Sequence, residues 1–192
     1  QMQRIEPTTI FNIGKITTSL KIDQNPEIAD SPAAKDKDGC DFNSYRMGDR
    51  TFYGRRDDFE LDATKELTVV TQFITDDGTD TGDLIDIRRF YVQDGNVVPN
   101  SNSSIAGVNG NSVTDSLCNE MKDAFGDIND FKLKGGLKAM GEALERGVVL
   151  VMSLWDDSLS DMLWLDSDYP PSKPADAPGV ARGPCDTTSG KS

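Results

Sequence analysis

Two stretches rich in β-branched and aromatic residues most strongly limit how this chain can fold. Residues 67–74 read LTVVTQFI, and residues 87–98 read IRRFYVQDGNVV with the pair Asp94-Gly95 inside it. β-Branched residues favour strands, and an Asp-Gly pair favours a tight hairpin. The segment between them, DDGTDTGD, is typical of a turn-rich connection. The sequence therefore predicts one strand long enough to cross a sheet, followed by a strand pair.

Shorter strands are predicted elsewhere. Residues 1–35 contain brief apolar stretches that favour one or two short strands, and FELDA at 59–63 alternates in the manner of a strand. The apolar run at 147–155 has the pattern of a strand buried between two layers. Residues 36–54 are dense in Asp, Gly and aromatic residues, which predicts tight turns and a structured loop.

Helices are predicted only between these strands. SLCNEMKDAF at 116–125 forms one, and residues 131–147 form a second, with Gly147 placed to end it. After Trp164, Pro, Ser, Asp and Gly predict an extended loop or tail. Long strands, short helices and many turns together indicate a mainly β fold, a β-sandwich with decorated loops.

Composition excludes several classes of function. The chain has 33 acidic and 20 basic residues, a net charge of −13, and no His. This acidity disfavours nucleic acid and anionic membranes as partners and suits a neutral ligand such as a sugar. Without His there is no Ser-His-Asp triad and no His-based metal site, so acid–base chemistry needs carboxylates, Tyr or Lys. No stretch has the length of a membrane span, and the first residues lack a signal-peptide pattern, so we expect a mature or truncated chain.

Cys40, Cys118 and Cys185 are too far apart for a zinc ribbon or a CxxC pair. One disulfide leaves a third cysteine, which is then either a free thiol or bonded to a partner outside this chain. The segment DKDGCD lacks the spacing of a calcium loop, and we expect no metal and no cofactor. Asn102 begins an N-x-S sequon, which permits N-glycosylation if the protein is secreted.

Several side chains are candidates for carbohydrate binding. Trp155 and Trp164 are flanked by Asp, and a flat ring can stack on a sugar face, although core packing explains both equally well. Arg46 and Arg182 can donate two hydrogen bonds to vicinal hydroxyls, although the sequence alone favours surface salt bridges.

Carboxylate pairs are a further possibility for chemistry. Glu60 and Asp62 share one face of the predicted strand, as the pair of acids of a glycosidase would. In so acidic a chain this spacing also arises by chance, and a solvated strand face is the simpler interpretation. Asp156-Asp157 is ambiguous in the same way.

Longer segments carry a resemblance. Six of these segments follow one another along the chain in this order: DKDGCDFNSYRMGDRTFYG, LTVVTQF, DIRRFYVQDG, KGGLKAMGEAL, VVLVMSLWDDSLSDMLWLDSDYP and PGVARGPC. Together they closely resemble the later half of glycoside hydrolase family 7, the fungal cellobiohydrolases and endoglucanases. The resemblance covers about residues 36–190. We therefore expect an unmatched segment at 1–35 and a partial catalytic domain at 36–192.

The resemblance implies a jelly-roll β-sandwich, here incomplete, and retaining hydrolysis of β-1,4-glucan by two Glu residues and an Asp in an ExDxxE motif. That motif is absent from the chain, and the nearest string, Glu60-x-Asp62-x-x-x-Glu66, has the wrong spacing. No catalytic residue is therefore assigned. The resemblance further implies that the complete enzyme is extracellular and monomeric and acts on cellulose and cello-oligosaccharides.

Binding residues follow from the resemblance position by position. Trp155 and Trp164 match the glucosyl platforms on the substrate and product sides of the cleavage point. Four residues match positions at the site of the released cellobiose: Asp38, Asp41, Arg46 and Arg182. Ser158 and Leu159 replace two aromatic residues that many cellobiohydrolases have at these positions. The long loop at 167–183, in contrast, resembles the corresponding loop of the exo-acting enzymes.

The resemblance also pairs Cys40 with Cys118 and places the partner of Cys185 in the part of the family domain that this chain lacks. The expected function is exo-acting release of cellobiose, with this chain supplying the binding half. Endo action, a catalytically silent glucan-binding protein and a purely structural sandwich are the alternatives.

Overall fold

A computed structural model of the chain describes residues 8–11, 18–20, 39–55, 58–149, 157 and 159–189. Its strands are β1 (Thr8–Phe11), β2 (Thr18–Leu20), β3 (Cys40–Phe42), β4 (Tyr53–Gly54), β5 (Leu61–Asp62), β6 (Thr68–Thr75), β7 (Leu84–Gln93) and β8 (Asn96–Pro99). Its helices are α1 (Asp115–Phe125), α2 (Asp130–Leu133), α3 (Gly136–Glu145) and α4 (Leu163–Asp166). The fold is thus mainly β with short helices, as predicted. No helix among these residues has the length and apolar character needed to cross a membrane.

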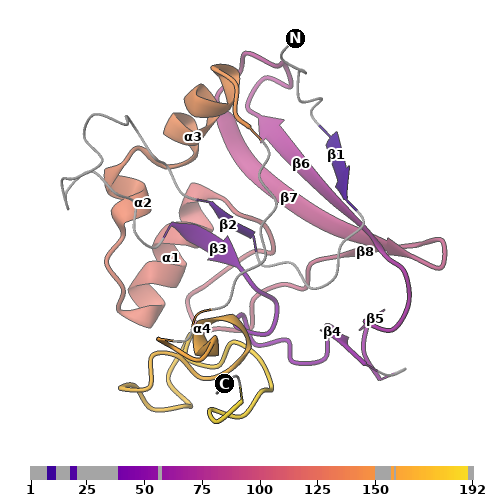
Figure 1. Cartoon of the computed structure of the whole chain (residues 1–192). Helices are drawn as coiled ribbons and strands as arrows, with labels where there is room; N and C mark the ends of the chain where they lie inside the picture. The colour runs from indigo at the N-terminus through magenta and orange to yellow at the C-terminus, as the bar shows by residue number, and fades with distance from the viewer. Residues whose placement is uncertain are drawn as a thin grey trace.

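The largest sheet is antiparallel, in the order β1-β6-β7-β8 (Figure 1). β6 and β7 are the two predicted strands, and their register places Val69 opposite Tyr91. β7 and β8 form the predicted hairpin, in which Asp94 and Gly95 have φ values of 51° and 79°. Positive φ at both central residues is the requirement of the tight hairpin turn that Asp-Gly favours.

The sheet buries one face under the rest of the chain. On β7, Ile87, Arg89, Tyr91 and Gln93 alternate inward and are all buried. Ile87 joins a core formed with α1, α2 and α3, whereas Tyr91 packs with Phe52 and Leu61 in a second cluster. Figure 1 shows α3 beside one end of β7 and the segment of α4 at the opposite end of the molecule.

Three predicted elements differ from the structure. The strand at 59–63 is reduced to Leu61–Asp62, which pairs with β4. The single helix predicted at 131–147 is interrupted, because Gly135 and Gly136 have φ values of 99° and 60° and separate α2 from α3. Residues 147–149 are exposed and do not form a strand, and the rest of the predicted strand at 147–155 lies outside the described residues.

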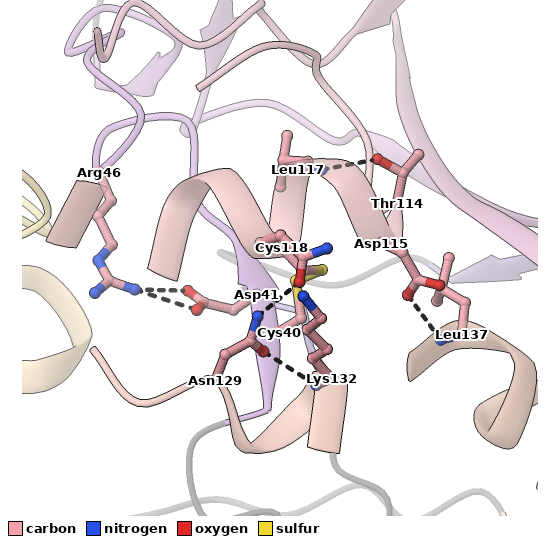
Figure 2. The surroundings of a disulfide bond; sticks show 11 residues. Cys40, Asp41, Arg46, Thr114, Asp115, Leu117, Cys118, Asn129, Lys132 and Leu137 are labelled. Atoms are coloured by element: carbon pink, nitrogen blue, oxygen red, sulfur yellow. Dashed lines mark hydrogen bonds and ion pairs between the residues drawn. A yellow bond between two sulfur atoms is a disulfide. The ribbon is translucent and has the colours of Figure 1, made fainter. Parts of the chain in front are cut away.

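The disulfide Cys40–Cys118 joins β3 to α1 (Figure 2). Around it, polar contacts fix the helices to one another. The Thr114 hydroxyl accepts from the Leu117 N–H at the start of α1, and Asp115 accepts from the Leu137 N–H at the start of α3, at 2.9 Å. The disulfide therefore fixes β3 against α1, and the turn that follows β3 begins from a fixed position. Cys185 is exposed and lies outside this disulfide, and the position of its partner stays a prediction.

Candidate functional site

Arg46 follows β3 and is 7% exposed. Its Nε donates to the Gly179 carbonyl at 2.8 Å, and its Nη1 lies 3.2 Å from Asp41. Its Nη2 lies 3.7 Å from Asp127, and its guanidinium carbon lies 4.5 Å from the centre of the Phe125 ring. Every nitrogen of this guanidinium thus has a partner within the protein. Arg46 is therefore placed to hold other groups in position, and Figure 2 shows its side chain directed at Asp41.

Asp41 lies on β3, next to the disulfide, and its side chain is 14% exposed. Both of its oxygens are within hydrogen-bond reach of Arg46 Nη1, at 3.2 and 3.5 Å. A carboxylate has about four lone-pair positions, so Asp41 keeps the capacity to accept a hydroxyl proton from a ligand. The ion pair with Arg46 fixes the direction of that acceptor.

Arg182 is bonded differently. Its Nε donates to the Tyr169 carbonyl at 3.4 Å, and its guanidinium carbon lies 5.5 Å from the centre of the Tyr169 ring. Burial, and then the like charge of Arg46, lower the pKa of Arg182 from its ordinary value, while Asp41 and Asp127 oppose this. Within the described part of the chain, its two Nη groups have no hydrogen-bond partner. Arg182 therefore offers a planar pair of donors to a ligand.

Backbone contacts hold Arg182 near Arg46. The Asn43 side chain donates to the Arg182 carbonyl at 3.2 Å, while its oxygen accepts from the Arg46 N–H at 3.3 Å. The N–H of Arg182 donates to the Ser167 carbonyl at 3.0 Å, just beyond the end of α4. The turn after β3, the segment around Arg182 and the end of α4 therefore form one connected unit.

Trp164 lies on α4 and is half-buried. Its Nε1–H donates to Asp157 at 2.8 Å, and the same carboxylate accepts from the Ser160 hydroxyl and from the Leu159 N–H. These hydrogen bonds, the one from Ser160 first, lower the pKa of Asp157. Because the indole edge is fixed in this way, the ring has a defined orientation, as a stacking platform requires.

Two hollows lie on the described surface. One, of about 70 Å³, is bordered by Arg182, Asn43 and Tyr45, and is well below the ~300 Å³ at which ligand pockets begin. The other, of about 230 Å³, contains Glu60 and Asp62. Neither of these two hollows reaches the volume of a typical ligand pocket.

The carboxylates considered in the sequence lie in different surroundings. Glu60 and Glu66 are exposed, and Asp62 Oδ1 accepts from both the N–H and the hydroxyl of Thr64. The Asp62 side chain is 12% exposed, and its Oδ2 lies 4.0 Å from Lys65 Nζ. Asp157, the described member of the Asp156-Asp157 pair, is engaged with Trp164.

The structure thus brings Asp41, Arg46 and Arg182 together and connects them to α4, which carries Trp164. Asp38, Trp155 and Asp156 lie outside the described residues. The sequence analysis did not identify three further residues of this site. Phe125 and Asp127 contact Arg46, and Lys173 contacts both of them. Lys173 Nζ donates to the Phe125 carbonyl and lies 3.3 Å from Asp127, a contact across nearly 50 residues that no local pattern indicates.

Comparison with solved structures identifies relatives of known activity. A family 7 cellobiohydrolase from Daphnia pulex is 57% identical, with a TM-score of 0.79, over 82% of this chain and 36% of that chain. A cellobiohydrolase from Melanocarpus albomyces in complex with cellotetraose is 38% identical, with a TM-score of 0.70, over 85% of this chain and 36% of that one. An endoglucanase I in complex with cellobiose is 34% identical, with a TM-score of 0.68, over 82% of this chain and 35% of that one.

This chain therefore spans little more than a third of the length of the solved chains that it matches. The relatives share its β-sandwich fold and include enzymes of both the cellobiohydrolase and the endoglucanase type. The model of glycosyl hydrolase family 7 matches residues 18–192. The chain belongs to glycosyl hydrolase family 7, the family of these cellulases.

Proposed function

We propose that this chain forms the product-binding part of an exo-acting cellobiohydrolase that cleaves β-1,4-glucan with retention of configuration and releases cellobiose. The observation that carries the proposal is the 57% identity with a cellobiohydrolase over 82% of the chain. The relatives in complex with cellotetraose and cellobiose support an oligosaccharide as the ligand. The long loop at 167–183, which resembles that of the exo-acting enzymes, supports exo action, and endo action is the alternative.

The chain's own residues account for binding. Trp164 presents a fixed ring on which the apolar face of a glucosyl unit stacks. The Nη groups of Arg182 donate to vicinal hydroxyls, and Asp41 accepts from another hydroxyl. Arg46 acts through Asp41 and Gly179, because its donors are already occupied. Asp38 and Trp155 are proposed as further ligand contacts.

Retaining hydrolysis needs a carboxylate nucleophile and a carboxylic acid about 5 Å apart. The sequence has no ExDxxE motif, so no residue of this chain is proposed for either role. The same observation favours a second candidate function, a glucan-binding protein without catalytic activity. We expect no turnover of an aryl β-cellobioside by the 192-residue chain. Turnover would instead direct mutation to Glu60, Asp62 and Glu66.

Binding of cellobiose tests the proposal directly. Calorimetric titration of the chain is expected to give saturable binding, weakened about tenfold or more in R182M, because a hydrogen bond from a charged group contributes about 1.5–3 kcal/mol. W164A is expected to weaken binding as well. R146M is the matched control, since Arg146 is exposed at the end of α3, away from α4 (Figure 1). Equal effects of R182M and R146M would contradict the proposed site.

We further propose that the protein is extracellular, monomeric and N-glycosylated at Asn102. Asn102 is exposed on a loop whose neighbouring residues are fixed, since Ser104 donates from its N–H to the Met47 carbonyl at 2.9 Å. Expression through a secretory pathway is expected to give a mass excess that a glycosidase for N-linked chains removes and that N102Q lacks. An unmodified secreted chain would refute the assignment.

A further inference from the structure

The long loop after α4, residues 167–183, is attached to the end of α1 by Lys173. Lys173 Nζ donates to the carbonyl of Phe125, the last residue of α1, at 2.8 Å. It also lies 3.3 Å from Asp127, two residues further on. The carbonyl end of a helix carries partial negative charge, which an ammonium group stabilises. Both partners of Lys173 thus favour the same position for this part of the loop.

Gly179 makes a second attachment on the same helix end. It is buried with φ of +77°, and a Cβ there would lie 2.5 Å from the Phe125 ring. The carbonyl of Gly179 accepts from Arg46 Nε, and Arg46 covers the Phe125 ring as well. Asp127 lies 3.3 Å from Lys173 and 3.7 Å from Arg46. Its carboxylate therefore forms ion pairs with both the Lys173 ammonium group and the buried Arg46 guanidinium.

Arg182 lies near the end of the loop, three residues after Gly179. Its two ends are bonded to each other, since the Tyr169 N–H donates to the Val180 carbonyl and the Arg182 N–H donates to Ser167. The Tyr169 carbonyl and ring in turn contact the Arg182 side chain. The direction of the Arg182 guanidinium therefore depends on where the body of the loop lies on α1.

We infer that Lys173 and Asp127 are positioning residues that fix the 167–183 loop on the end of α1 and so orient Arg182 for the sugar. The part that concerns the sugar rests on the proposed function. Neither residue contacts Arg182 through a hydrogen bond, and their effect passes through Phe125, Gly179 and Tyr169. Lys173 and Asp127 are 37% and 33% exposed, so their attraction is partly screened by solvent and salt.

Hydrogen exchange tests the attachment without reference to any ligand. In the full chain, K173M is expected to increase exchange of the amides between residues 169 and 182, and D127N is expected to do so to a smaller extent. K173R retains a donor and a positive charge and is expected to restore protection. K138M is the control, because Lys138 forms an exposed ion pair of 2.7 Å with Asp83, on α3 and outside the loop. Unchanged exchange in K173M overturns the inference.

Titration with cellobiose tests the consequence for Arg182. K173M is expected to weaken binding about threefold to tenfold, as a partly exposed ion pair and a helix-end contact allow, and K173R is expected to restore it. Faster exchange in K173M with an unchanged Kd overturns the positioning role. Failure of the unmodified chain to bind cellobiose counts against the proposed function, whereas the attachment of the loop is still decided by exchange.

Discussion

The guanidinium carbon of Arg46 lies 4.5 Å from the centre of the Phe125 ring, on a side chain that is 7% exposed. This contact joins the turn after β3 to the end of α1. The same guanidinium pairs with Asp41 and Asp127 and donates to Gly179, so it meets three separate parts of the chain. Arg46 is therefore expected to stabilise the fold as well as the site.

The first prediction concerns this residue. R46M leaves Asp41 without its cation in a mostly buried position, and removal of one partner of a buried ion pair costs about 3 kcal/mol or more. Urea unfolding is expected to show this loss. K138M is the control, because the pair of Lys138 with Asp83 is exposed and contributes at most ~1 kcal/mol. Equal losses in the two variants would contradict a structural role for Arg46.

A second prediction isolates the close approach of Gly179 to Phe125. Gly179 and Gly78 have similar φ values, +77° and +72°, but nothing lies within 4 Å of a Cβ placed at Gly78. G78A is expected to cost about 1 kcal/mol from the backbone conformation alone. G179A adds a clash with the Phe125 ring and is expected to cost about 1–3 kcal/mol more. Similar urea midpoints for the two variants would show that the ring moves aside freely.

Local sequence rules predicted the elements whose cause is local. The β6 strand and the β7–β8 hairpin follow from β-branched residues and the pair Asp94-Gly95, which adopts the backbone that the turn requires. The interruption at Gly135-Gly136 was missed because the apolar spacing continues across it. Two successive residues with positive φ end a helix whatever the side-chain pattern on either side.

The candidate site was only partly accessible to the same reasoning. The resemblance indicated Asp41, Arg46 and Arg182, and the structure brings them together. It did not indicate that Arg46 is saturated by protein partners while the Nη groups of Arg182 are available. That difference depends on long-range contacts. One example is the hydrogen bond from Arg46 to Gly179, two residues that are 133 positions apart in the sequence. Only the folded chain places them side by side.

A third prediction concerns the disulfide. Cys40 and Cys118 are 78 residues apart, and a loop of that size is expected to stabilise the folded chain by about 4 kcal/mol through the entropy of the unfolded state. C40A/C118A is expected to lose that amount in urea unfolding. C185S is the control, because Cys185 is exposed and lies outside the Cys40–Cys118 disulfide. A loss below about 1 kcal/mol in the double variant would contradict the entropic argument.

The last prediction concerns pH and Trp164. The pKa of Asp157 is lowered from 3.8 by the Ser160 hydroxyl first and then by Trp164. Since the folded-state pKa lies below the unfolded one, this stabilisation is complete above the unfolded pKa and is lost as pH falls through the folded pKa. In a W155F background, the fluorescence of Trp164 is expected to change with a midpoint below the ordinary pKa of an Asp carboxyl. D157N keeps an acceptor for the indole but does not titrate, so it is expected to abolish the transition. A transition that persists in D157N would assign it to a different carboxylate and separate the orientation of Trp164 from Asp157.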